Sequence, residues 1–177
     1  MAMDKLAHLQ TFADVSVATA AMSAILIALR AERIDDPRLV WGLGGLLSWS
    51  LAALFFSLFP LILDAYEIGI ETTWKVGLLG VALHAFAHAI GFGGYDMVLL
   101  NRGIDVDCSR NAEPVKMKPL MYLVYSMIGI FSAWAAFSAL NSPSAGSYFL
   151  ALVVQISFAF WLFLFFLITY PSKSSSK

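Results

Sequence analysis

The chain has 177 residues, of which 60% are hydrophobic and only 13% are charged. A soluble domain is typically about 25% charged, so this chain lacks the polar residues that a water-facing surface needs. Its net charge of −1 gives no indication of a nucleic-acid partner, and its single cysteine, Cys108, excludes an intramolecular disulfide. Composition therefore predicts an integral membrane protein that is surrounded by the lipid bilayer.

Five segments are long and apolar enough to cross that bilayer, because a transmembrane helix needs about 20 predominantly apolar residues. They cover residues 9–29, 39–63, 75–100, 119–140 and 148–170. The connections are short except for the polar stretch 101–118, and no internal repeat is visible. We therefore predict an all-α fold, a single transmembrane domain over residues 1–177 that forms a bundle of five helices.

The basic residues predict the orientation of this bundle, because loops rich in lysine and arginine stay in the cytoplasm. Most of them fall on one side of the predicted membrane, namely Arg30, Arg33, Arg38, Arg102, Arg110, Lys116, Lys118, Lys173 and Lys177. Only Lys5 and Lys75 fall on the other side. We expect the N-terminus outside and the C-terminus in the cytoplasm, in the inner (plasma) membrane of a bacterium.

The first segment carries a carboxylate, Asp14, within its apolar run. Ionisable groups in the hydrocarbon region are costly and need a physical reason. Asp14 could be a proton or cation site, or it could cap the helix or pair with a histidine. It shares a stripe with Gln10, Val17, Ala18 and Ala21, and a second stripe of small residues is made by Ser16, Ala20, Ala24 and Ala28. Both stripes favour close contact with another helix, in the bundle or in an oligomer.

The stretch FADVSVATAAMSAILIALR, with the short charged loop and the Trp- and Leu-rich segment after it, resembles a broad set of uncharacterised small bacterial membrane proteins. Their first helix often has an acidic residue before a run rich in alanine and glycine. Here Ala21 and Ser23 stand where glycine is commoner. The resemblance covers about the first 60 residues, the first two helices, and it implies no catalytic activity.

The third segment contains HAFAHAIGFGG, in which His84 and His88 are four residues apart and share one helix face. Glycines and a tyrosine share the same stripe, namely Gly77, Gly80, Gly91 and Tyr95. Two histidines at this spacing could both reach one metal ion, although zinc or iron would need further ligands. The bordering glycines would also suit a haem, but no other predicted span has a histidine for its second axial position. Proton handling, or plain hydrogen bonding within the bundle, explains the same pair.

Two further polar residues are secondary candidates. Asp96 lies close to the predicted inner end of the third segment, where Arg102 or Lys116 could pair with it, and Gln155 lies in the fifth segment. Because nothing beyond the histidine pair points to catalysis, we expect a non-enzymatic multi-pass membrane protein that handles ions or protons or serves as an accessory subunit. It could form a homo-oligomer or join a larger membrane complex. The alternative is a redox subunit that binds haem or a transition metal through His84 and His88.

Overall fold

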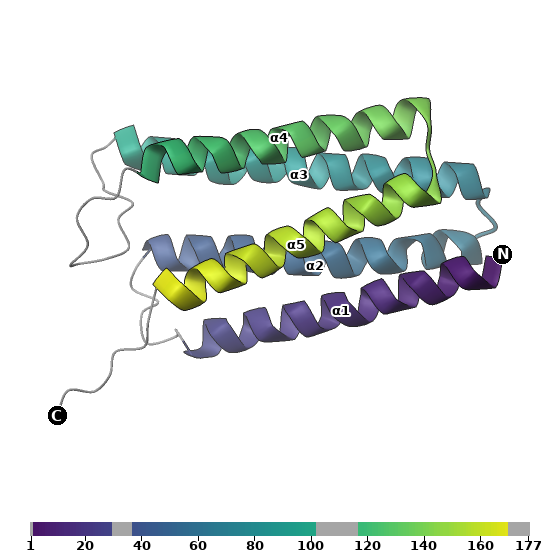
Figure 1. The fold of residues 1–177 in the computed structure, drawn as a ribbon, viewed down its shortest axis with the longest axis horizontal. Coiled ribbons are helices and arrows are strands. Elements are labelled where there is room, and N and C mark those ends of the chain that lie inside the picture. The colour runs from purple at the N-terminus through teal and green to yellow at the C-terminus, as the bar shows by residue number, and fades with distance from the viewer. Residues whose placement is uncertain (1, 30–36, 102–116, 170–177) are drawn as a thin grey trace.

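The computed structural model describes residues 2–29, 37–101 and 117–169, which form five long α-helices (Figure 1). They are α1 (Ala2–Leu29), α2 (Pro37–Ala65), α3 (Ile70–Asn101), α4 (Met117–Asn141) and α5 (Ala145–Thr169). Each contains a stretch long and apolar enough to cross a membrane, namely Leu9–Ala28, Leu43–Ala65, Ile70–Gly91, Leu123–Asn141 and Ala145–Phe165. The predicted all-helical fold with five candidate spans is therefore confirmed for the described part of the chain. The orientation of the termini stays a prediction.

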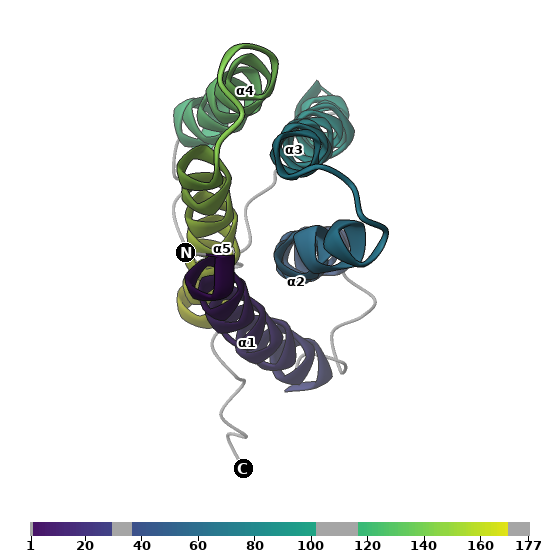
Figure 2. The ribbon, with the colours of Figure 1, turned by 90° about the vertical axis from the view of Figure 1, so that its right-hand side faces the viewer.

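The helices are arranged as two antiparallel pairs and a fifth helix that crosses them. Figure 2 shows α1 beside α2 and α3 beside α4, and Figure 1 shows α5 running obliquely along the bundle. α5 packs more extensively against α2 and α1 than against α4. The start of α1 and the end of α5 consequently lie at opposite ends of the bundle (Figure 1).

Two serine pairs join α1 to α2. The Ser16 and Ser57 hydroxyl oxygens lie 3.4 Å apart, and those of Ser23 and Ser50 lie 3.0 Å apart. The members of each helix are seven residues apart, which is the repeat expected of helices that wind around each other. Hydroxyl pairs of this kind hold helices together in lipid, where apolar contacts alone give no preference for a partner helix.

This contact face differs from the predicted stripe of small residues on α1. Ser16 is buried, whereas Ala24 and Ala28 are exposed. Four-residue steps advance about 40° around a helix, so three of them carry Ala28 about 120° away from Ser16. The buried face instead follows a mixture of three- and four-residue steps, through Leu9, Ala13, Ser16, Thr19, Ser23 and Leu26.

Pro60 lies inside α2 and leaves a backbone carbonyl one turn earlier without its helical hydrogen bond. Proline has no backbone N–H, so it cannot bond the carbonyl four residues before it, which is that of Phe56. The hydroxyl of Tyr148, from α5, donates to this carbonyl instead. Tyr148 is fully buried, and Gly77 on α3 gives its ring room, because a Cβ at Gly77 would lie only 2.5 Å from the ring. Three helices are thus joined at one point.

α2 ends in a turn that has a left-handed residue. Glu67 has a φ of 57°, and the amide of Ile68 donates to the Leu63 carbonyl at 3.1 Å. The Glu67 amide donates to the Asp64 carbonyl at 2.9 Å. These two bonds form the motif that commonly ends helices with glycine at the left-handed position.

Candidate functional site

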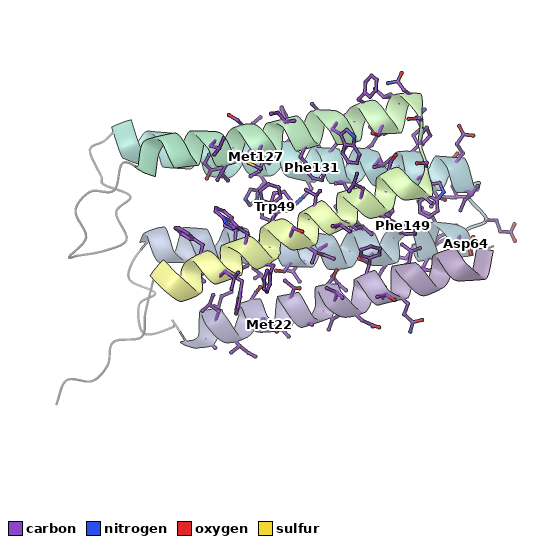
Figure 3. All side chains as sticks on the ribbon, viewed as in Figure 1. Met22, Trp49, Asp64, Met127, Phe131 and Phe149 are labelled. Carbon is purple, nitrogen blue, oxygen red and sulfur yellow. The ribbon has the colours of Figure 1, made fainter. Side chains whose placement is uncertain are left out.

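A group of buried and half-buried polar side chains lies where α2, α3 and α5 meet. It consists of Ser48, Trp49, His84, His88 and Gln155, and is called here the polar centre. Trp49 and Gln155 are fully buried, and His88 is 8% exposed. Figure 3 shows Trp49 in the interior of the bundle, away from both ends. The structure therefore brings together His84, His88 and Gln155, three of the residues singled out in the sequence.

His84 is held from both sides. Its Nδ1 lies 3.4 Å from the amide nitrogen of Gln155, and its Nε2 lies 3.2 Å from the hydroxyl of Ser48. An amide nitrogen can only donate, so Nδ1 accepts, and in the neutral ring Nε2 then carries the hydrogen and donates to Ser48. The chain Ser48–His84–Gln155 thereby connects α2, α3 and α5.

Trp49 organises the rings of the polar centre. Its ring centroid lies 5.0 Å from that of His84 and 5.0 Å from that of His88, in edge-to-face arrangements. On another side it stacks with Phe158 of α5 at 5.1 Å. The two histidine rings lie 6.0 Å apart. Both imidazoles are thus packed against one indole.

Trp49 Nε1 and Gln155 Oε1 of the polar centre are buried and have no hydrogen-bond partner within the described ranges. Buried polar atoms are nearly always hydrogen-bonded, because leaving one unpaired costs about 1–3 kcal/mol. One is a donor and the other is an acceptor. Their side chains both contact His84.

The glycines beside the histidines are covered by aromatic rings. A Cβ at Gly77 would lie 2.5 Å from the Tyr148 ring, and one at Gly80 would lie 2.6 Å from the Phe56 ring. The glycine stripe therefore accommodates side chains of α2 and α5 at these two positions. A flat macrocycle would have no room there unless both rings moved.

The donor atoms of the polar centre are two imidazoles, an amide and a hydroxyl. Among the described residues no three or more His, Cys, Asp or Glu side chains form a group that could hold a metal ion. A zinc site takes three or four protein ligands from His, Cys, Asp and Glu. The histidine pair supplies two of them, so a metal ion bound here would need further ligands.

The predicted carboxylate Asp14 is not part of this arrangement. Asp14 is exposed on the outward side of α1, with Gln10, Val17, Ala18 and Ala21 of its stripe also exposed. Asp96 lies on α3, but its side chain and the proposed partners Arg102 and Lys116 fall outside what the structure describes. The side chain of Tyr95, on the histidine stripe, likewise falls outside the described part of the chain.

Sequence reasoning missed Trp49 and Ser48. The signal was available, because SWS interrupts the apolar second segment with two hydroxyls around an indole. Tryptophan in membrane proteins is commonest at the membrane interface. A tryptophan six residues inside the span Leu43–Ala65 is a departure from that preference.

No protein-family model, curated protein or solved structure matches the chain.

Proposed function

We propose that this protein is a non-enzymatic, multi-pass protein of a bacterial inner membrane that serves as an accessory subunit of a larger membrane complex. The observation that carries the proposal is the outward position of Asp14 on α1. The partner is a transmembrane helix of another protein that presents a hydrogen-bond donor or a cation at the depth of Asp14.

The polar side chains that face the interior of the bundle support this proposal, because they contact other helices of the same chain. Ser132 donates to the Ala82 carbonyl at 2.8 Å and so joins α4 to α3. The serine pairs join α1 to α2, and Tyr148 joins α5 to α2. Inward-facing polar groups thus hold the helices of this chain together.

Asp14 lies outside the helix–helix contacts that the described residues make. It lies five residues inside the span Leu9–Ala28 and is exposed. Lys75, which is also exposed near the start of a span, can extend its long side chain to the interface, whereas the side chain of aspartate is too short to do so. The nearby Ala18 and Ala21 are small enough for another helix backbone to come close. The small residues would let a partner helix approach, and a hydrogen-bond donor on that helix would pair with the Asp14 carboxylate.

The proposal is tested by crosslinking in the native membrane. A photoreactive residue at Ala18 should yield one defined product, in which mass spectrometry finds a transmembrane peptide with a donor side chain at matching depth. The same residue at Ile130, which is 70% exposed on α4, is the control and should yield none. Asp14→Leu should abolish the product, and Asp14→Asn should retain part of it. A product made of two copies of this chain, or no product at Ala18, would refute the proposal.

Proton handling at the polar centre is a second candidate, and the chain Ser48–His84–Gln155 favours it. The imidazole of His84 can exchange a proton with the Ser48 hydroxyl, while the Gln155 amide holds the ring in orientation. In proteoliposomes, a pH-dependent proton flux should then fall strongly in His84→Phe and remain in Ser132→Ala. A flux that is equal in both variants, or absent in the unmodified protein, would exclude this candidate.

A further inference from the structure

An apolar groove opens on the surface between α4 and α5. It has a volume of about 440 Å³, which lies in the range of about 300–1,000 Å³ typical of small-molecule sites. Its walls include Met127 of α4 and Val154, Ser157, Phe158 and Trp161 of α5. In a membrane this groove would face lipid, so any ligand must be lipid-soluble.

The groove lies directly against the polar centre. Phe158 lines the groove, and its ring is also the one that stacks on Trp49 at 5.1 Å. Gln155 follows Val154, another lining residue, and points into the core, where it is fully buried. Figure 3 shows Met127 and Trp49 at similar positions along the long axis of the bundle. Phe158 therefore belongs both to the wall of the groove and to the packing around Trp49.

We infer that the groove binds an uncharged, lipid-soluble ring compound of the phenol or hydroquinone class, whose hydroxyl reaches Trp49 Nε1 and Gln155 Oε1 once the Phe158 ring turns aside. A hydroxyl accepts one hydrogen bond and donates another, which matches one unpaired donor and one unpaired acceptor.

The groove walls favour an aromatic ring over an acyl chain. Phe158 and Trp161 offer ring faces and edges for aromatic contacts, and Met127 offers a thioether, which packs well against rings. A hydroxyl is also uncharged, so carrying it to this depth avoids the cost of a buried ion. The inference does not depend on the docking role proposed for α1.

The test uses photolabelling of the full-length protein in lipid nanodiscs with a diazirine-bearing alkylphenol. Thymol and para-cymene are the competitors, because they differ only in the hydroxyl. Label should appear on Met127, Val154 or Trp161, and thymol should displace it at several-fold lower membrane concentration than para-cymene. Equal displacement by the two competitors, or equal labelling of the lipid-facing residues Ile130 and Phe137, would show that the groove holds apolar molecules without selection and would overturn the inference.

Variants identify the atoms that recognise the hydroxyl. Each hydrogen bond contributes roughly a two- to tenfold preference, so Trp49→Phe and Gln155→Leu should each reduce the advantage of thymol by that factor. Trp49→Phe keeps a ring for Phe158 to stack on, and Gln155→Leu tests the site independently if the first variant folds poorly. Ser157→Ala is the matched control, since it removes the hydroxyl that lines the groove itself. Loss of the preference in Ser157→Ala, with no loss in the other two, would contradict the assignment.

Discussion

The bond from the Tyr148 hydroxyl to the Phe56 carbonyl gives the sharpest test of the structure. Tyr148→Phe keeps the buried ring and removes only the donor. The Phe56 carbonyl, which receives no N–H from Pro60, is then left without a hydrogen-bond donor. An unsatisfied buried group costs about 1–3 kcal/mol, while side-chain hydrogen bonds between membrane helices have measured near 0.6 and up to about 1.7 kcal/mol. We expect Tyr148→Phe to lower the free energy of unfolding by about 1–1.5 kcal/mol.

The second half of the test restores the missing donor within α2. Pro60→Ala supplies an amide that can bond the Phe56 carbonyl in the ordinary helical manner. In this background Tyr148→Phe should be nearly neutral, because the carbonyl no longer depends on α5. The double-mutant cycle should therefore give a coupling energy of about 1 kcal/mol between two residues that are 88 positions apart in the sequence.

The assay is reversible unfolding of the purified protein in mixed micelles by increasing the mole fraction of SDS, followed by circular dichroism. Phe137→Leu, at a 66% exposed position on α4, is the control and should change little. If Tyr148→Phe costs the same with proline and with alanine at position 60, the assignment of this hydroxyl to the freed carbonyl is wrong.

Three further predictions concern helix contacts and use the same unfolding assay. Gly77→Ala should destabilise the protein by about 2–3 kcal/mol, because the new Cβ would lie 2.5 Å from a fully buried ring; Gly44→Ala, with nothing within 4 Å of its added Cβ, should be neutral or stabilising. Ser23→Ala and Ser50→Ala should each cost about 0.5–1 kcal/mol, and the double variant should cost less than their sum, since they share one contact; additive costs would show that the pair is not coupled. Glu67→Gly should stabilise the protein by about 0.5–1 kcal/mol, because glycine adopts the left-handed conformation at no steric cost; a loss of stability would mean that the side chain has a role the backbone does not explain.

The number and kind of helices could be predicted because length and apolarity determine them. A bilayer span sets a minimum run of about 20 residues, and five runs of that length stand out in a chain with 13% charged residues. The turn at Glu67 was harder to predict from the sequence, because the left-handed position is not occupied by glycine.

The direction in which each face points was harder to predict. In lipid both faces of a helix are largely apolar, so hydrophobic periodicity does not distinguish the inside from the outside. The stripe containing Asp14 was expected to contact another helix, and within this chain it faces outward. The serines Ser16 and Ser23 face inward because their partners on α2 repeat at the same interval. Pairing across two helices is the information that a single helix pattern lacks.

The candidate site was predicted in part. His84 and His88 share a face because of their spacing alone, and Gln155 was noted because it is polar in an apolar run. Their convergence on Trp49 depends on how α2, α3 and α5 pack together. The glycines next to the histidines were read as room for a cofactor, but Gly77 and Gly80 receive the rings of Tyr148 and Phe56. A glycine in a helix predicts close approach and does not identify what approaches.

The serine pairs between α1 and α2 also bear on how the register of this hairpin is chosen. A slide of seven residues, about 10 Å along the axis, would bring one serine of α1 opposite the other serine of α2 and keep a single pair. A slide of three or four residues would keep none. Each pair is worth only about 0.6 kcal/mol, so in hairpins joined by these serines alone each of the two shifted registers would be populated at roughly one third the level of the native register. Packing against the remaining helices must therefore disfavour the shifted registers. α5 is placed to do this, because it packs against both α1 and α2.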